Sequence, residues 1–288
     1  MSLFQHEALA TSPSWQGLRS VKHLVIFGDS YSSVDYDGLQ SPHPTWQEPL
    51  GVPFPGRTWA SMNKDDPNWV GHLVNMIADE RQDLLVFDYA KGGDRVENFD
   101  YQVNKGFQTI RDKPEWAPWT AGDSLFVTWV GINDCAYIGA GIGTAKTSIA
   151  TLFKYQEILY EAGARNFMFV DVPPMHLAPS WKRLMSPEAI ATSTVAIWNK
   201  QLVSRAKKFA ADHPDATVIL FSSWLAFSII LDNPTEYGLK PSDIHEGFSS
   251  VWCDHLHPTS SVHRGVALAI HDFLSHVAPV VSPTTTTT

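Results

Sequence analysis

Hydrophobic residues are concentrated in five short runs that are rich in β-branched and aromatic side chains. Within each run the apolar positions are nearly continuous, which is typical of strands covered by helices on both faces of a parallel sheet. The pattern therefore predicts five strands of a central parallel sheet, at residues 21–27, 84–89, 124–130, 165–172 and 217–223.

Segments of helical length separate these runs. In 145–162, for example, apolar side chains recur at the spacing of three and four residues that an amphipathic helix requires. Strands that alternate with helices favour a doubly wound, three-layer α/β/α fold, in which ligands bind beyond the carboxyl ends of the strands. The predicted helices are 68–80, 145–162, 187–212 and 259–276.

The chain has 288 residues, of which 44% are hydrophobic, so it can bury a full core without disulfides or metals. No linker or charge block divides it. We expect an N-terminal extension over 1–20, a single domain over 21–278 and a disordered tail over 279–288, because the tail has almost nothing apolar to bury.

The net charge of -9 would repel a nucleic acid backbone, and no basic cluster offsets it. No apolar stretch approaches the roughly 20 residues of a membrane span. Residues 1–20 lack the pattern of a signal peptide, which predicts a cytoplasmic protein as written, or a secreted one if a native leader was removed. The sequence does not fix the oligomeric state.

Two cysteines, Cys135 and Cys253, are too few for a disulfide framework and match no zinc motif. We interpret them as two buried thiols, with pairing as the alternative.

Residues suited to acyl transfer follow the predicted strands. Ser30 comes directly after the first strand, in a Gly-Asp-Ser turn that we expect to open a helix, and Gly93 follows the second. Asn133 follows the third strand, while Asp254 and His257 precede the last helix. Each motif alone is often only a turn, but together they converge on one edge of the sheet.

The chemistry assigns a role to each of these groups. Ser30 needs an imidazole to accept its proton, and His257 needs a carboxylate such as Asp254 to fix its tautomer. The negative charge that develops on the carbonyl oxygen requires preorganised donors. The amides of Ser30 and Gly93 and the side chain of Asn133 are suitable donors.

A metal site is the competing interpretation of the C-terminal motif, since His-x-His pairs often bind metals. Its ligands would be Asp254, His255, His257 and His263. No distant carboxylate or histidine cluster in the sequence completes a coordination set.

With these motifs the chain resembles the GDSL family of esterases and lipases, in its SGNH subgroup. The resemblance covers roughly 21–276 and rests on Phe27-Gly28-Asp29-Ser30-Tyr31, on Gly93, on Gly131-Ile132-Asn133-Asp134 and on Asp254-His255-Leu256-His257-Pro258. Tyr31 stands where the family name expects Leu, a replacement that we place outside the chemistry. The resemblance implies a flavodoxin-like sheet and a serine hydrolase that needs no metal or cofactor.

Within that family the motifs look most like fungal carbohydrate acetylesterases, so the expected substrate is a small-molecule or carbohydrate ester. A lipid-directed acyl hydrolase or an acyltransferase would use the same residues, and a non-catalytic binding module is the alternative from another class. Irregular segments at 36–69 and 233–252 are expected to shape the site. Their tryptophans are candidate substrate contacts or loop packing: Trp46, Trp59, Trp69 and Trp252.

Overall fold

The computed structural model describes residues 4–62, 65–181 and 187–280. Its centre is a six-stranded sheet in the order β1-β6-β5-β4-β2-β3. The strands are β1 (Glu7–Ala10), β2 (His23–Gly28), β3 (Leu85–Asp88), β4 (Ser124–Trp129), β5 (Asn166–Val170) and β6 (Thr217–Phe221). Strands β2 to β6 are parallel and match the five predicted runs, and their order is the flavodoxin-like one.

The sheet has one strand more than the five predicted. Strand β1 lies in the segment expected to be an extension outside the domain, and it pairs antiparallel with β6 at the sheet edge. Trp15 is fully buried, and its indole nitrogen donates to the carbonyl oxygen of Val277 at 2.8 Å. The described part of 1–20 therefore belongs to the domain. Most of the predicted tail, 281–288, lies outside the described residues.

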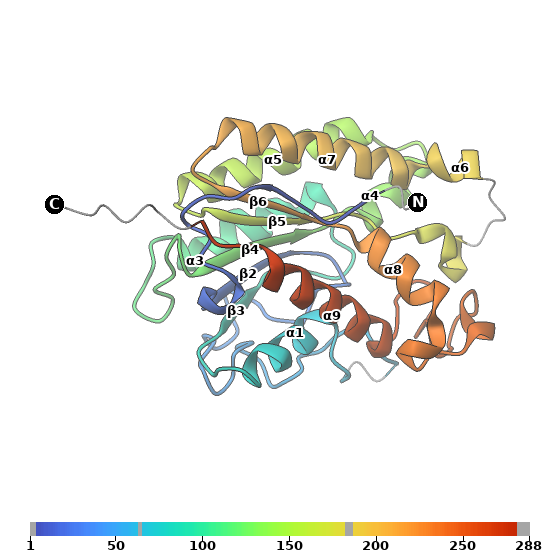
Figure 1. Ribbon diagram of the computed structural model, residues 1–288, viewed down its shortest axis with the longest axis horizontal. Helices are drawn as coiled ribbons and strands as arrows, with labels where there is room; N and C mark the ends of the chain where they lie inside the picture. Colours follow the sequence, from blue (N-terminus) through green and yellow to red (C-terminus); the bar gives the residue numbers. More distant parts are fainter. Residues whose placement is uncertain (1–3, 63–64, 182–186, 281–288) are drawn as a thin grey trace.

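Helices cover both faces of the sheet (Figure 1). Helices α5 (Ala145–Glu161) and α7 (Thr194–Asp212) pack side by side on one face, and α1 (Trp69–Ala78) and α9 (Ser260–His276) pack together on the other. All residues of β2, β4, β5 and β6 are buried between them, as their continuous apolar patterns require.

The predicted helix 187–212 is two helices, α6 (Pro187–Ala191) and α7. Ser193 separates them because its side chain caps α7, accepting a hydrogen bond from the amide of Ala196 at 3.2 Å. Several further helices were not predicted, since they are short or uniformly apolar: α2 (Phe99–Tyr101), α3 (Gln108–Arg111), α4 (Ile132–Gly139) and α8 (Ser223–Asp232).

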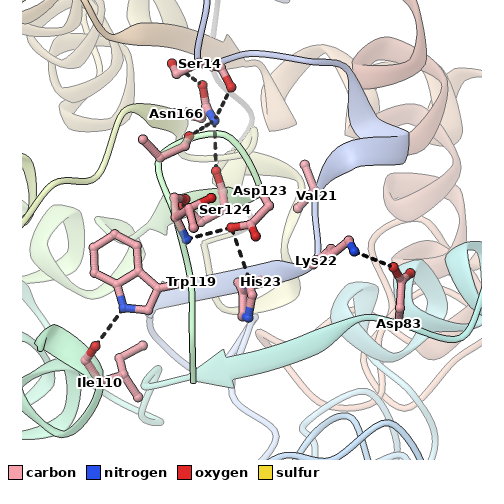
Figure 2. A network of polar contacts seen from close by, with 12 residues as sticks. Ser14, Val21, Lys22, His23, Asp83, Ile110, Trp119, Asp123, Ser124 and Asn166 are labelled. Carbon is pink, nitrogen blue, oxygen red and sulfur yellow. Dashed lines mark hydrogen bonds and ion pairs between the residues drawn. The ribbon is translucent and has the colours of Figure 1, made fainter. Parts of the chain in front are cut away.

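Polar side chains at the amino ends of the parallel strands bond to one another (Figure 2). The side-chain amide of Asn166 donates to the carbonyl oxygens of Ser14, Ala121 and Ser124 at 2.8 to 3.2 Å. Asp123 accepts from the amide of Thr120 at 2.7 Å, and its carboxylate lies 3.3 Å from the ring of His23. The polar side chains at this edge are therefore occupied by hydrogen bonds within the protein, whereas the candidate reacting groups lie at the carboxyl edge.

Candidate active site

Ser30 lies directly after β2, at the carboxyl edge of the sheet. The side chain of Asp29 accepts from the amide of Tyr31 at 3.1 Å, and its carbonyl oxygen accepts from the amides of Ser32 and Ser33 at 3.1 and 3.0 Å. Burial raises the pKa of the Asp29 carboxyl to about 7. These bonds hold Ser30 in a tight turn, and the helix expected to start there is not formed.

Three side chains form a continuous chain of hydrogen bonds beside this turn. The hydroxyl oxygen of Ser30 lies 2.8 Å from Nε2 of His257, and Nδ1 of His257 lies 2.7 Å from Oδ2 of Asp254. Ser30 and His257 are buried, with 6% and 9% of their surfaces exposed. The fold brings together residues 227 positions apart in an arrangement that can move a proton from a hydroxyl to an imidazole.

The carboxylate of Asp254 is held by its own loop. Its Oδ1 accepts from the amides of Leu256 and His257 at 2.6 and 2.7 Å. Burial acts to raise the pKa of Asp254, but the hydrogen bonds from the ring and amide of His257 and from the amide of Leu256 outweigh it and lower the pKa to about 2. Asp254 is therefore a fixed anion beside the imidazole.

Tyr31 joins the serine turn to the histidine loop. Its hydroxyl donates to the carbonyl oxygen of Leu256 at 2.7 Å, one residue before His257. The side chain is buried, and its ring centre lies 6.0 Å from that of His257. Our interpretation of Tyr31 as a neutral replacement was incomplete, because the hydroxyl that Leu lacks anchors the loop. The only signal for this contact in the sequence was the hydroxyl group of Tyr31, at the position where the family name expects leucine.

Three groups are candidate donors to an oxyanion: the backbone amides of Ser30 and Gly93 and the side chain of Asn133. Gly93 lies in the loop after β3, and Asn133 follows β4. Within the described part of the chain, neither the Ser30 amide nor the Gly93 amide donates to another residue. Gly93 has a φ of +83°, and a Cβ built there would meet nothing within 4 Å, so open space lies in front of it. The side-chain nitrogen of Asn133 donates to the carbonyl oxygen of Asp94 at 3.0 Å. Because an amide carries two N–H donors, one remains for a ligand.

Gln102, which the sequence did not single out, links two of these loops. Its side chain accepts from the amide of Gly28 at 2.9 Å and donates to the carbonyl oxygen of Gly28 and to Oδ2 of Asp94, both at 2.7 Å. It sits in a π-helical turn, Gln102–Phe107, a feature often found near functional sites. This buried residue fixes the end of β2 relative to the loop that carries Gly93.

Among the described residues, Trp59 is the one candidate tryptophan whose ring pairs with the ring of this histidine. Its ring stacks on that of His257, with centroids 4.9 Å apart and planes at 26°. The thiol of Cys253 donates to the carbonyl oxygen of Trp59 at 2.9 Å. Cys135 and Cys253 are both buried and unpaired, so the alternative that they form a disulfide was wrong.

The structure does not support Trp69 and Trp252 as substrate contacts. Both are buried, and their ring nitrogens donate to Oγ of Ser32 at 3.1 Å and to the carbonyl oxygen of Ile244 at 2.7 Å. They pack the loops against the domain. Trp46 is 64% exposed and is not among the residues that line the cavity beside Trp59.

The alternative metal site lacks a ligand set. Both ring nitrogens of His257 are engaged by Ser30 and Asp254, and His263 is buried in α9 against the Tyr31 ring. Across residues 4–62, 65–181 and 187–280, no three His, Cys, Asp or Glu side chains gather in a way that could hold a metal ion.

The model of the GDSL-like lipase/acylhydrolase family matches residues 24–270. The chain belongs to this family. As a GDSL-like lipase/acylhydrolase it is a carboxylic ester hydrolase. Over the described residues, no helix combines the length and apolar character needed to cross a membrane.

Two curated proteins are similar to this GDSL chain in sequence. An acetylesterase from Thermothelomyces thermophilus is 31% identical over 273 residues, which cover 88% of each chain. A phosphatidylcholine-sterol acyltransferase from Aeromonas hydrophila is 27% identical over 249 residues, which cover 80% of this chain and 67% of the other.

Solved structures share the fold of this GDSL chain. A variant of an acetyl xylan esterase from Geobacillus stearothermophilus superposes with a TM-score of 0.54 at 13% identity, covering 95% of this chain and all of the other. An alpha/beta hydrolase from the Lake Arreo metagenome gives 0.55 at 13% identity, covering 96% and 100%. The expected three-layer α/β fold of the family is confirmed.

Proposed function

We propose that this protein is a serine esterase that hydrolyses short-chain acyl esters, chiefly acetyl esters of carbohydrates. Ser30 is the nucleophile, His257 the general base and acid, and Asp254 the residue that orients the imidazole. The observation that carries the proposal is the continuous chain of hydrogen bonds from Ser30 through His257 to Asp254, at 2.8 and 2.7 Å.

In the first step the hydroxyl oxygen of Ser30 attacks the ester carbonyl while its proton passes to Nε2 of His257. The carbonyl oxygen becomes an oxyanion, which the amides of Ser30 and Gly93 and the free N–H of Asn133 stabilise. When the carbon–oxygen bond to the alcohol breaks, His257 returns the proton to the leaving oxygen. The products are the free alcohol and an acyl group on Ser30.

In the second step water replaces the alcohol. His257 takes a proton from water as its oxygen attacks the acyl carbon, the same donors stabilise the new oxyanion, and the proton then passes to Ser30 as the acid leaves. Asp254 stays ionised throughout, because its pKa of about 2 lies far below neutral pH. Its charge stabilises the imidazolium form in both steps.

Three findings support an acetylated carbohydrate as the substrate. The curated relative with 31% identity is an acetylesterase, and a solved structure of the same fold is an acetyl xylan esterase. Trp59 also presents a ring beside the catalytic imidazole, and aromatic rings often stack on sugars.

A second candidate is a lipid-directed acyl hydrolase or an acyltransferase with the same catalytic residues. The similarity to a phosphatidylcholine-sterol acyltransferase favours it. The two candidates differ in the acyl-chain length that they prefer and in the molecule that accepts the acyl group. Both differences can be measured.

The test compares initial rates on p-nitrophenyl acetate, butyrate, octanoate and palmitate, with and without a chelator. Ser30→Ala should abolish turnover of every ester and prevent labelling by a serine-directed phosphonate, while Ser275→Ala, at an exposed serine of α9, should change neither. Acetate should be the fastest substrate. Fastest turnover of palmitate, or acyl transfer to an added alcohol in preference to water, would favour the second candidate. Wild-type turnover by Ser30→Ala, or its loss with chelator, would overturn the serine mechanism.

A further inference from the structure

A polar cavity of about 490 Å³ has in its wall Trp59, the residue that stacks on His257. It is formed by the loop after β2 and the loop after β3, and Trp59 is part of its wall. Four charged residues line it as well: Asp35, Asp37, Arg57 and Lys91. None of the reacting groups named above lines the cavity, so its role is separate from theirs.

The position of Trp59 indicates which part of an ester would occupy this cavity. The Trp59 ring stacks on the ring of His257, 4.9 Å between centroids. In ester hydrolysis the imidazole protonates the leaving oxygen, so the alcohol must lie next to His257. The shared Trp59 wall is our basis for placing the alcohol of the ester, rather than its acyl group, in this cavity.

Two of the four charged residues already form an ion pair. The ammonium of Lys91 lies 3.0 Å from Oδ2 of Asp37, and the hydroxyl of Tyr101 donates to the same oxygen at 3.1 Å. This pair builds a fixed polar wall and has limited capacity left for a ligand.

The other two charged groups have no such partner. Within the described residues, the carboxylate of Asp35 and the guanidinium of Arg57 make no hydrogen bond or ion pair with another side chain or carbonyl. Asp35 also has a φ of 65°, a left-handed conformation that is uncommon for residues other than glycine. Such conformations persist where surrounding structure imposes them, and they cluster at ligand sites. Both groups are exposed to the cavity and have unused hydrogen-bonding capacity.

The charges of the cavity indicate the chemistry of its ligand. Two carboxylates face two cations, so the lining has no net charge that would favour an anion or a cation. Charged walls disfavour a long acyl chain, because the chain would desolvate them without replacing their hydrogen bonds. An uncharged alcohol with several hydroxyls can donate to Asp35, accept from Arg57 and lay a ring face on Trp59.

We propose that this cavity is the subsite for the sugar that carries the ester, with Asp35 and Arg57 binding its free hydroxyls and Trp59 supporting its ring. The proposal rests on the function proposed above and deepens it. Asp35 and Arg57 are then residues that determine specificity for the alcohol and take no part in bond breaking.

The test compares two acetyl esters that differ only in the alcohol, methyl 3-O-acetyl-β-xyloside and p-nitrophenyl acetate. The quantity measured is the ratio of their kcat/KM values for wild type, Asp35→Asn and Arg57→Gln. Asn tolerates a left-handed backbone, so Asp35→Asn removes the charge without new strain. Because only the xyloside offers hydroxyls, the ratio should fall at least about tenfold in each variant. The matched controls, Asp232→Asn and Arg264→Gln at exposed helix positions, should keep the wild-type ratio.

The proposal is overturned if the ratio of either cavity variant stays within about twofold of wild type, or if wild type cleaves p-nitrophenyl acetate but not the xyloside. Ser30→Ala is measured in parallel. If that variant retains wild-type turnover of p-nitrophenyl acetate, the serine esterase function itself has failed, which is a different result from failure of the subsite.

Discussion

The hydroxyl of Tyr31 donates to the carbonyl oxygen of Leu256 across 2.7 Å, although 225 residues separate them in the sequence. Tyr31 follows Ser30, the proposed nucleophile, and Leu256 precedes His257, the proposed base. The bond therefore spans the two segments whose separation determines whether Ser30 and His257 stay within hydrogen-bonding distance. It makes Tyr31 a positioning residue.

Tyr31→Phe removes this bond and leaves the carbonyl oxygen of Leu256 without its buried donor, which should cost about 1 to 2 kcal/mol of unfolding free energy. Because the loop then holds His257 less accurately, kcat for p-nitrophenyl acetate should fall about tenfold with little change in KM. Tyr237→Phe is the control, since its hydroxyl has no partner among the described residues. Equal kcat values for Tyr31→Phe and wild type would contradict the positioning role.

Asn133→Ala removes the proposed side-chain donor to the oxyanion, so kcat should fall about a hundredfold. KM should change little, because the donor acts on charge that develops after binding. Asn75→Ala, at an exposed position of α1, is the control and should match wild type. Stopped-flow or steady-state kinetics on p-nitrophenyl acetate checks this. A rise in KM with kcat unchanged would assign Asn133 to substrate binding instead.

Asp254 should contribute to stability in a defined pH range. Its folded pKa, about 2, lies below the ordinary value of 3.8, so the ionised carboxylate favours the folded state. This contribution is complete well above pH 4 and is lost as the pH falls through about 2. It amounts to at most about 2 kcal/mol, and less in practice because a third of the side chain is exposed.

Urea unfolding of wild type and Asp254→Asn between pH 7 and pH 3 measures that contribution. The difference in unfolding free energy should narrow as the pH falls below 4. If the difference in unfolding free energy between wild type and Asp254→Asn stayed constant from pH 7 to pH 3, ionisation of the Asp254 carboxylate would not be its source.

Comparing Gly131→Ala with Gly141→Ala separates the cost of a steric clash from the cost of a strained backbone conformation. Gly131 has a φ of 130°, and a Cβ there would lie 2.4 Å from the buried ring of Trp198. Gly141 has a φ of 87° but open space around it. Gly141→Ala should therefore cost about 1 kcal/mol from backbone strain alone, and Gly131→Ala about 1 to 3 kcal/mol more from overpacking.

Urea denaturation of the two glycine variants gives these values directly. The Gly131 variant should also lose activity, because the displaced backbone carries Asn133 with it. Similar unfolding free energies for the two variants would show that Trp198 yields to the added methyl group.

The carboxyl edge of the sheet was predictable because it depends on local patterns. Continuous apolar runs identified β2 to β6, and the residue types that follow them named Ser30, Gly93 and Asn133. The edge strand β1 was missed because four half-exposed residues, Glu7–Ala10, carry no run long enough to recognise. Their pairing with β6 is a long-range contact that no local pattern encodes.

The sequence by itself determined the order of the parallel strands, the family motifs and the residues that we propose as reacting groups, because these follow from periodicity and from short segments of fixed spacing. Only the tertiary structure decided which side chains meet. It separated Trp59, stacked on His257, from Trp69 and Trp252, which are buried in packing. It also brought Asp35 and Arg57 into one cavity and Gln102 beneath the serine turn. These contacts depend on how loops that are distant in the sequence fold against each other. Residue type alone does not encode which loops meet.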